Sequence, residues 1–181
     1  MFRLTGSRCY LVPFEEKHIN DTEYLDWLRD YDVVKTINRP DYLLPVSLLK
    51  VREYCETIMR SSNDMFLAIY DKKDEIFIGT MRAGHINWQT GTADIGIMIG
   101  NRNYWGKGIA TDAIKTLGQF LFHKVGLRRL TAGLMAANPA MMKAFQRAGF
   151  RQEGILRQHD SYEGKFMDHI YLGCLRDEFQ P

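Results

Sequence analysis

The sequence lacks long apolar runs and has few cysteines. None of its apolar segments approaches the roughly 20 residues that a membrane-spanning helix needs, and the N-terminal segment has no signal-peptide character. We therefore expect a cytoplasmic protein without a membrane partner. Cys9, Cys55 and Cys174 are odd in number, widely spaced and without a Cys-x-x-Cys pair. This argues against a disulfide framework or a zinc site and predicts reduced, buried thiols and no bound metal.

A strong excess of positive charge is also missing. The 24 lysines and arginines and the 22 aspartates and glutamates give a net charge of +2, and the only short basic cluster of note in the C-terminal half is Arg128-Arg129. The chain therefore has no electrostatic signature of nucleic-acid binding. Its 181 residues, 45% of them hydrophobic, contain no repeat and no Pro/Gly/Ser-rich linker, so we expect one domain over residues 1–181.

Alternating and helical apolar patterns divide the chain into strands and helices. Strands are predicted over 4–12, 65–70, 76–86, 92–100, 130–136, 150–157 and 166–175, and helices over 15–28 (one or two), 47–59, 109–126 and from 139 to a C-cap at Gly149. Ser47, Asn138 and Pro139 are favourable helix-start residues, and residues 41–45 form a turn-rich break. The order predicts an α+β fold, a mixed and mostly antiparallel sheet of about seven strands flanked by about four helices.

The most informative segment, Asn103–Thr111, contains two glycines two positions apart, Gly106 and Gly108. It lies between the predicted strand 92–100 and a helix that begins near Ile109. Glycines let the main chain turn tightly and approach a ligand closely, and the helix points its first N–H groups and the positive end of its dipole at the loop. The segment therefore predicts a site for an anionic group such as a diphosphate.

Two nucleotide-binding motifs fail to match this loop. A Walker A motif has four residues between its first glycine and the Gly-Lys pair, then Ser or Thr, whereas five residues separate Gly100 from Gly106 and Gly108 follows Lys107. A dinucleotide-binding motif needs a third glycine where Thr111 stands, after an opening βαβ unit. A strand–turn–helix connection without any ligand is the remaining alternative.

Three blocks of the sequence together resemble one family. They are 95–111, 138–150 (Asn-Pro-Ala-Met-Met-Lys-Ala-Phe-Gln-Arg-Ala-Gly-Phe) and 164–168 (Gly-Lys-Phe-Met-Asp). In this order and spacing they are similar to the GNAT superfamily of acyl-CoA-dependent N-acetyltransferases, and most to the branch that holds ribosomal-protein N-terminal, spermidine and amino-sugar acetyltransferases. The resemblance covers nearly the whole chain and implies the GNAT fold.

The resemblance also implies acetyl-CoA as the acyl donor and a set of residues that bind it. The glycine loop would wrap the diphosphate with main-chain N–H groups, and the preceding strand and a later helix would hold the pantetheine arm. The residues concerned are Trp105, Gly106, Lys107, Gly108, Ile109, Ala110 and Thr111 in the loop, Met98, Ile99 and Gly100 on the strand, and Asn138 and Lys143 on the helix.

Two positions depart from the family pattern. Asn103 stands where Gln or Arg is common, and Phe145 stands where many relatives carry a tyrosine that protonates the departing thiolate.

The implied reaction is direct attack of a neutral amine on the thioester, which needs a proton acceptor and donors for the oxyanion. Asp94 is the first candidate base, because the matching position in this branch is usually acidic; a solvent-facing or ion-paired carboxylate is the alternative. Tyr162 is a second-rank candidate acid, with a surface hairpin tyrosine as its alternative. A main-chain N–H around Met98 or Ile99 would stabilise the oxyanion.

Other reactive side chains are weaker candidates. His85 and His159 are proton relays through water or, more commonly for such residues, packing side chains. Cys174 has no partner at a spacing that would make it a nucleophile. Three aromatic residues are either walls of the acceptor site or ordinary packing residues, with packing as the default: Trp27, Trp88 and Tyr104.

The acceptor is expected near the two N-terminal helices, 15–60, where the resembling family builds specificity. Four residues of the connecting segment would overhang the amine: Tyr31, Asp32, Arg39 and Tyr42. The whole pattern predicts an acetyl-CoA-dependent N-acetyltransferase of small amines, with an amino sugar or nucleotide-linked amino sugar ahead of a polyamine. The alternatives are an N-terminal acetyltransferase of a ribosomal or other protein and, in another class, a non-catalytic acyl-CoA sensor, which Phe145 keeps open. Homodimerisation is also left open.

Overall fold

An eight-stranded sheet in the order β1-β2-β3-β4-β5-β6-β8-β7 forms the centre of the computed structural model, which describes residues 2–37 and 46–180. The strands are β1 Leu4–Thr5, β2 Cys9–Pro13, β3 Met65–Asp71, β4 Phe77–Asn87, β5 Thr92–Ile99, β6 Arg129–Met135, β7 Arg151–Tyr162 and β8 Lys165–Leu175. Neighbouring strands are antiparallel except β5 and β6, which run parallel. Arg39, Tyr42 and the whole turn-rich segment 41–45 lie outside the described residues.

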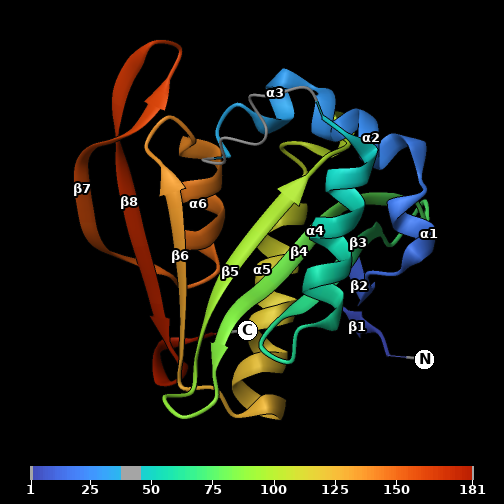
Figure 1. Cartoon of the computed structure of the whole chain (residues 1–181). Coiled ribbons are helices and arrows are strands. Elements are labelled where there is room, and N and C mark those ends of the chain that lie inside the picture. The colour runs from blue at the N-terminus through green and yellow to red at the C-terminus, as the bar shows by residue number, and fades with distance from the viewer. Residues whose placement is uncertain (1, 38–45, 181) are drawn as a thin grey trace.

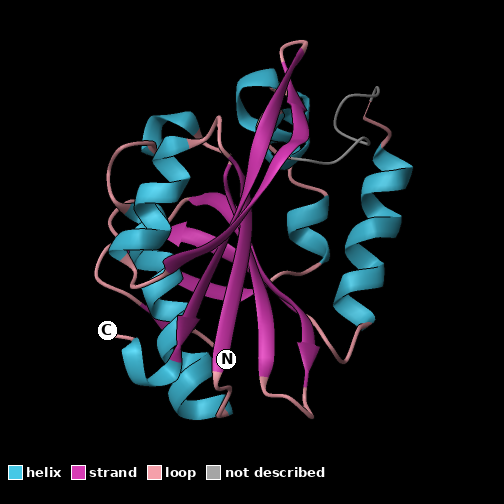
Figure 2. Ribbon diagram, turned by 90° about the vertical axis from the view of Figure 1, so that its left-hand side faces the viewer, coloured by secondary structure: helices cyan, strands magenta, loops and turns pink. Residues whose placement is uncertain are grey.

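Helices cover both faces of this sheet (Figures 1 and 2). They are α1 Glu16–Ile19, α2 Thr22–Arg29, α3 Tyr31–Val34, α4 Leu48–Arg60, α5 Ile109–Phe120 and α6 Pro139–Arg147. The alternation of side chains along a strand supplies a core to each face. On β5, Ile95 and Ile99 pack in the core that contains α5 and α6, whereas Met98 packs in the core that contains α1, α2, α3 and α4.

The parallel pair at the centre of the sheet is short. β5 and β6 pair over three residues only, and Asp94 opposite Thr131 is the last pair. Beyond it β5 continues to Ile99 beside β4, and β6 continues to Met135 beside β8. Figure 1 shows the two strands diverging toward their C-terminal ends. The sheet is therefore split in two halves at this point, and the loop after β5 begins at the open end of the split.

The structure confirms the α+β prediction, with eight strands and six α-helices in the described part of the chain against the roughly seven and four expected. The single strand predicted over 4–12 is wrong: it is two strands, because the chain reverses after Gly6 and Leu4 pairs with Leu11. The strand predicted over 150–157 extends to Tyr162, because it pairs along β8 across two irregularities. The three cysteines are buried free thiols, as predicted. Within the described ranges, no helix combines the length and the apolar character needed to cross a bilayer.

A half-buried carboxylate fastens the N-terminal strands to α5. Asp112, in the first turn of α5, accepts the backbone N–H groups of Ser7, Arg8 and Cys9 at 3.0, 2.8 and 3.0 Å. Burial alone raises the pKa of the Asp112 carboxyl, but the three donors stabilise its charged form, and the net result is a pKa below the usual value. The ionised carboxylate therefore stabilises the folded state.

We expect Asp112→Ala to lower the free energy of unfolding by about 1.5–3 kcal/mol at pH 7, because hydrogen bonds to a charged acceptor are lost. The folded pKa lies below the unfolded value of about 3.9, so this contribution is present above that pH and is lost as the pH falls through the folded pKa. Urea denaturation at pH 7 and in acid measures both effects. Asp177→Ala, at a side chain that is 97% exposed, is the control; equal midpoints for Asp112→Ala and wild type at pH 7 would contradict the prediction.

Candidate active site

The split between β5 and β6 opens into a cleft of about 800 Å³. Its walls come from both halves of the sheet, the glycine loop, the start of α5, α6 and the segment around α3. Of the residues predicted to bind acetyl-CoA or to act as base or acid, all but Gly100 and Lys107 line this cleft; of the residues predicted over the acceptor, Asp32 lines it and Tyr31 does not. The fold therefore brings the predicted site together from segments that are distant in the chain.

The glycine loop has the backbone that an anion site requires. Gly106 and Gly108 have φ values of 73° and 78°, in the left-handed region that favours glycine. Gly108 is the N-cap of α5 and no side chain caps this helix end. Because the first helical bond runs from the Asp112 N–H to the Gly108 carbonyl, the N–H groups of Ile109, Ala110 and Thr111 have no partner within the helix. These three donors and the helix dipole face the cleft end of the loop.

Arg8 adds a positive charge beside the loop that the sequence did not indicate. A Cβ built on Gly108 would lie 3.5 Å from Arg8 Nε. Arg8 is distant from the loop in the sequence and is brought to it by the hydrogen bond of its backbone N–H to Asp112, 104 positions away. Lys107 lies over the Tyr104 ring, 4.9 Å from the ring centroid. Tyr104 is buried, donates its hydroxyl hydrogen to Asp74 at 2.8 Å and also lines the cleft, so it both packs and forms part of the wall.

The last residues of β5 direct their backbone groups to different sides. The Gly100 N–H bonds toward β4 at 2.9 Å, and because antiparallel pairs alternate, the backbone of Met98 also faces β4. The backbone groups of Ile97 and Ile99 then face the split. The Ile99 carbonyl accepts the indole N–H of Trp105 at 2.7 Å, which leaves the Ile99 N–H directed into the split. Of the three strand residues predicted to pair with a ligand, Ile99 alone presents its backbone there.

Gly100 has a packing role instead. A Cβ at this position would lie 2.1 Å from Cδ2 of Trp27, so the indole lies directly on the backbone. Trp27, on α2, is buried and packs against Phe77 with ring centroids 4.9 Å apart. The packing interpretation is confirmed for Trp27. Trp88 is 58% exposed, donates its indole N–H to Asn63 at 3.0 Å and does not line the cleft.

α6 forms the opposite wall of the cleft. Asn138 caps this helix by accepting the Met141 N–H at 3.0 Å, as its sequence predicted, and its amide nitrogen donates to the Thr36 hydroxyl at 2.9 Å. Lys143 is exposed at the rim. Phe145 is buried and lines the cleft with a ring that has no proton to donate. Contacts of Asn138 and Lys143 with a pantetheine arm stay predictions.

Asp94 lies where β5 and β6 part. Its Oδ1 accepts the Thr131 hydroxyl hydrogen at 3.0 Å. Burial raises the pKa of the Asp94 carboxyl above its usual value, and this hydroxyl and the electrostatic interactions with His85, Arg82 and His169 lower it only in part. A raised pKa makes the carboxylate a better proton acceptor at neutral pH. The geometry therefore suits the predicted base, whose role is still untested.

The weaker candidates differ in whether they line the cleft. Tyr162 lines the mouth of the cleft at the tip of the β7–β8 hairpin, and burial together with the neighbouring Glu163 raises the pKa of its hydroxyl. His85 lines the cleft from β4, whereas His159 does not line it. Burial raises the pKa of the Cys174 thiol to about 11, which agrees with the prediction that this cysteine is no nucleophile.

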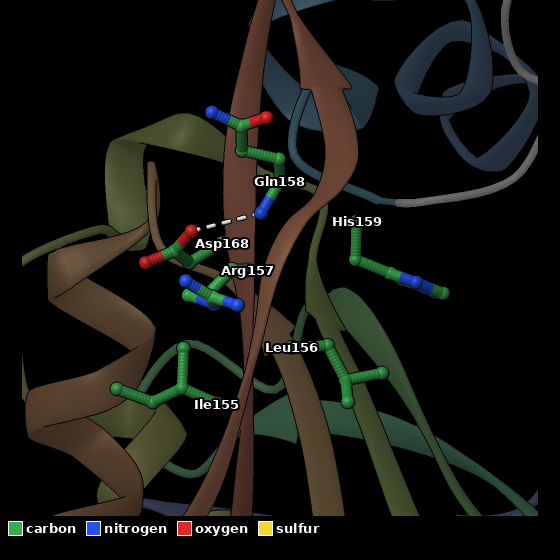
Figure 3. A pocket seen from close by; sticks show the side chains of 6 residues that line it. All are labelled: Ile155, Leu156, Arg157, Gln158, His159 and Asp168. Carbon is green, nitrogen blue, oxygen red and sulfur yellow. Dashed lines mark hydrogen bonds between the residues drawn. The ribbon is translucent and has the colours of Figure 1, made fainter.

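A second hollow, of about 720 Å³, lies on the β7–β8 hairpin (Figure 3). It is lined by Ile155, Leu156, Arg157, Gln158, His159 and Asp168. In Figure 3 the Gln158 N–H points at the Asp168 carboxylate, 2.9 Å away, and His159 extends to the other side of the hairpin. In the described parts of the chain, no three His, Cys, Asp or Glu side chains are grouped so as to hold a metal ion.

Two ionisable residues of the site were missed from the sequence. His169, on β8, lines the cleft, and Asp160, on β7, is 1% exposed with Oδ2 2.8 Å from His169 Nδ1. The two lie nine positions apart in a polar hairpin. Only an irregularity in the strand pairing brings their side chains together, and the sequence carries no signal for it.

The chain belongs to the acetyltransferase (GNAT) domain family, whose model matches residues 8–151. It is 28% identical to the probable N-acetyltransferase YjcK of Bacillus subtilis (strain 168), over 97% of this chain and 98% of the relative. It is 27% identical to the uncharacterized N-acetyltransferase p20 of Bacillus licheniformis, over 92% of this chain and 83% of the relative. The protein is therefore an N-acetyltransferase.

Solved structures share the fold. The spermidine N-acetyltransferase of Vibrio cholerae, in complex with CoA and spermine, superposes with a TM-score of 0.83 at 17% identity, over 96% of this chain and 98% of that one. RimJ of Mycobacterium smegmatis, in complex with CoA-disulfide, gives a TM-score of 0.81 at 20% identity, over 96% of this chain and 84% of that one. At these identities the likeness extends to the GNAT fold and not to the acceptor.

Proposed function

We propose that this protein, acting as one domain over residues 1–181, transfers an acetyl group from acetyl-CoA to the primary amine of a small molecule, with an amino sugar or nucleotide-linked amino sugar as the acceptor. The observation that carries the proposal is the split between β5 and β6. It connects the helix N–H groups of the glycine loop to a carboxylate, Asp94, within one cleft. The three buried free thiols suit the reducing cytoplasm.

The diphosphate and the pantetheine arm of acetyl-CoA match the N–H groups and positive charges that the cleft presents. The diphosphate would accept the N–H groups of Ile109, Ala110 and Thr111, with Arg8 and Lys107 nearby as positive charges. The pantetheine arm would lie in the split, where the Ile99 N–H faces it, and would pass Asn138 and Lys143 on α6. Trp105 fixes this region by bonding the Ile99 carbonyl.

The chain's own groups cover the steps of acetyl transfer. Asp94 takes a proton from the acceptor's ammonium, and the neutral amine attacks the thioester carbonyl. The Ile99 N–H donates to the oxyanion that forms. Phe145 cannot protonate the sulfur, so the thiol, with an ordinary pKa of about 8.5, leaves as a thiolate and takes its proton from solvent. Tyr162, at the mouth of the cleft, is the second candidate acid.

The charges of the cleft favour an acceptor that is not a polycation. Among the described residues that line it, two carry carboxylates, Asp32 and Asp94, and four are lysines or arginines, Lys35, Arg82, Lys143 and Arg147. Asp32 is itself paired with Lys35 at 2.8 Å. A spermidine-like acceptor needs several free carboxylates along its length, whereas an amino sugar, particularly one linked to a nucleotide, benefits from positive charge.

Gly108→Val is expected to abolish CoA binding, because a branched side chain would crowd the diphosphate site and strain a backbone at φ 78°. Calorimetry with CoA measures the affinity. Gly126→Val is the matched control: Gly126 also has a left-handed φ, 87°, but ends the helical segment that Gly108 begins. CoA affinity that is unchanged in a folded Gly108→Val protein would remove the diphosphate site from the loop.

Asp94→Asn is expected to reduce acetyl transfer by about 10²–10⁴-fold, because the amide accepts no proton at neutral pH, while CoA affinity stays unchanged. The same variant should melt at a higher temperature at pH 7. The folded pKa of Asp94 is raised, so its ionised form costs stability above that pKa, and the difference should fade below the unfolded value of about 3.9. A variant with wild-type turnover would make Asp94 a structural residue.

A panel of amines with acetyl-CoA, followed by free-thiol detection, tests the acceptor class. An α-amine with a pKa of about 8 is roughly one-tenth neutral at pH 7, whereas an alkyl amine near 10.4 is well under a thousandth neutral. We therefore expect higher kcat/KM for amino sugars and α-amines than for spermidine, with rates that rise from about pH 6 to 8.5. Spermidine ahead of every less basic amine would overturn the amino-sugar proposal, and CoA binding without transfer to any amine would favour a sensor.

A further inference from the structure

One ionisable pair of the cleft has no part in the proposed reaction so far. His169 projects from β8 into the cleft with its side chain 14% exposed, and its Nδ1 lies 2.8 Å from Oδ2 of Asp160. The Asp160 side chain is fully buried. A buried carboxylate bonded to an imidazole that reaches the substrate cleft is the arrangement by which enzymes orient a basic histidine.

A bulge in β7 creates this pair. Leu156 lies opposite His169 and Asp160 lies opposite Met167, so three residues of β7 face a single residue of β8. At the centre of the bulge Gln158 has a left-handed φ of 53°, and the Asp168 carboxylate accepts its N–H at 2.9 Å (Figure 3). Bulges of this kind re-aim side chains at functional sites. Here the bulge turns Asp160 inward, to the Nδ1 edge of the His169 ring.

A glycine makes room for the imidazole. A Cβ built on Gly133 of β6 would lie 2.6 Å from His169 Nε2, and both residues line the cleft. His169 lies opposite Met135, which shares a face of β6 with Thr131, the hydrogen-bond partner of Asp94. His169 and Asp94 are therefore on the same face of the sheet, on the two sides of the split.

The hydrogen bond also fixes which ring nitrogen can accept a proton. An ionised carboxylate only accepts hydrogen bonds, so Nδ1 of a neutral His169 carries the proton and donates it to Asp160. The lone pair is then on Nε2, and within the part of the chain that the structure describes no recorded hydrogen bond engages that nitrogen. Nε2 is the atom beside Gly133, at the cleft.

The proton balance of acetyl transfer leaves a role for a second proton acceptor beside Asp94. The acceptor nitrogen enters as an ammonium and ends as an amide with one hydrogen, so it loses two protons; one equivalent ends on the CoA sulfur and the other in solvent. Asp94 accounts for the first loss. We propose that Nε2 of His169, oriented by Asp160, accepts the proton that the nitrogen releases as it bonds to the acetyl carbon, and passes it to solvent. This role rests on the proposed acetyl transfer.

His169 would be a catalytic residue and Asp160 a positioning residue. The titratable and charged groups that face the imidazole are Asp160 and His159 of β7, Tyr171 of β8 and, across the split, Asp94 of β5. The rings of His159 and Tyr171 lie with centroids 5.5 and 5.0 Å from that of His169, and hold it edge-on. These contacts restrict the ring to the orientation that the carboxylate selects.

His169→Asn is the decisive variant, because the asparagine amide can still donate to Asp160 from the place of Nδ1 while nothing replaces Nε2. We expect kcat to fall by about 10²–10⁴-fold, with KM for acetyl-CoA and the melting temperature unchanged. When kcat is plotted against pH, the acid side of the profile should show one titrating group fewer. Asp160→Asn should lower kcat by about 10-fold or more and shift that side of the profile. His123→Asn, at an exposed imidazole in the helical segment after α5 and outside the cleft, is the control and should keep wild-type kcat.

Nitrogen-15 NMR of the histidine rings gives a readout that does not depend on turnover. Wild-type protein at pH 8 should show His169 protonated at Nδ1 and bare at Nε2, and a ring protonated at Nε2 would overturn the proposal. So would an active wild type whose His169→Asn variant keeps its kcat and its pH profile. A wild type that transfers acetyl groups to no amine, with the expected ring state, would instead overturn the acetyl transfer on which the role rests.

Discussion

The early parting of β5 from β6 is the constraint on which the site depends. Backbone N–H and C=O groups inside a sheet need partners, and each half of this sheet supplies them on its outer side only, through β4 and β8. Past Asp94 and Thr131 the inner edges face each other across a gap. A ligand with amide groups of its own can complete these edges as a strand would. The gap in the sheet and the proposed binding site are thus the same feature.

Two separate cores keep this gap open. The core with α5 and α6 and the core with α1 to α4 each have buried residues on β5, since Ile95 and Ile99 face one and Met98 faces the other. Neither core can close the split without losing contacts on its own face. The walls are therefore held by packing, and the proposed chemistry depends on a few polar side chains that line the cleft, such as Asp94 and His169.

What the sequence predicted and what it missed differ in kind. The glycine loop and the cap of α6 were predictable, because the backbone itself imposes Gly108 at a left-handed φ and Asn138 before a proline. The positions of Met98 and Ile99 on the strand were predicted, but not which of them faces the split, because that depends on register with β4. The pairing of His169 with Asp160 depends on a bulge, which no local preference marks. Local rules thus located the proposed anion site, whereas long-range register decided which groups are proposed to transfer protons.

The contact of Trp27 with Gly100 joins the segment where the acceptor amine is expected to the segment where acetyl-CoA is expected. Trp27 belongs to α2, in the segment where acceptor specificity is expected, and its indole lies on the backbone at the end of β5. With no side chain at Gly100 to shift, a displacement of α2 has to move the main chain that leads into the glycine loop. Thermodynamic linkage then makes the effect mutual: any change that a bound amine makes in CoA affinity, CoA makes equally in the affinity for the amine. The contact of one aromatic ring with one glycine is thus a physical link through which the two affinities can be coupled.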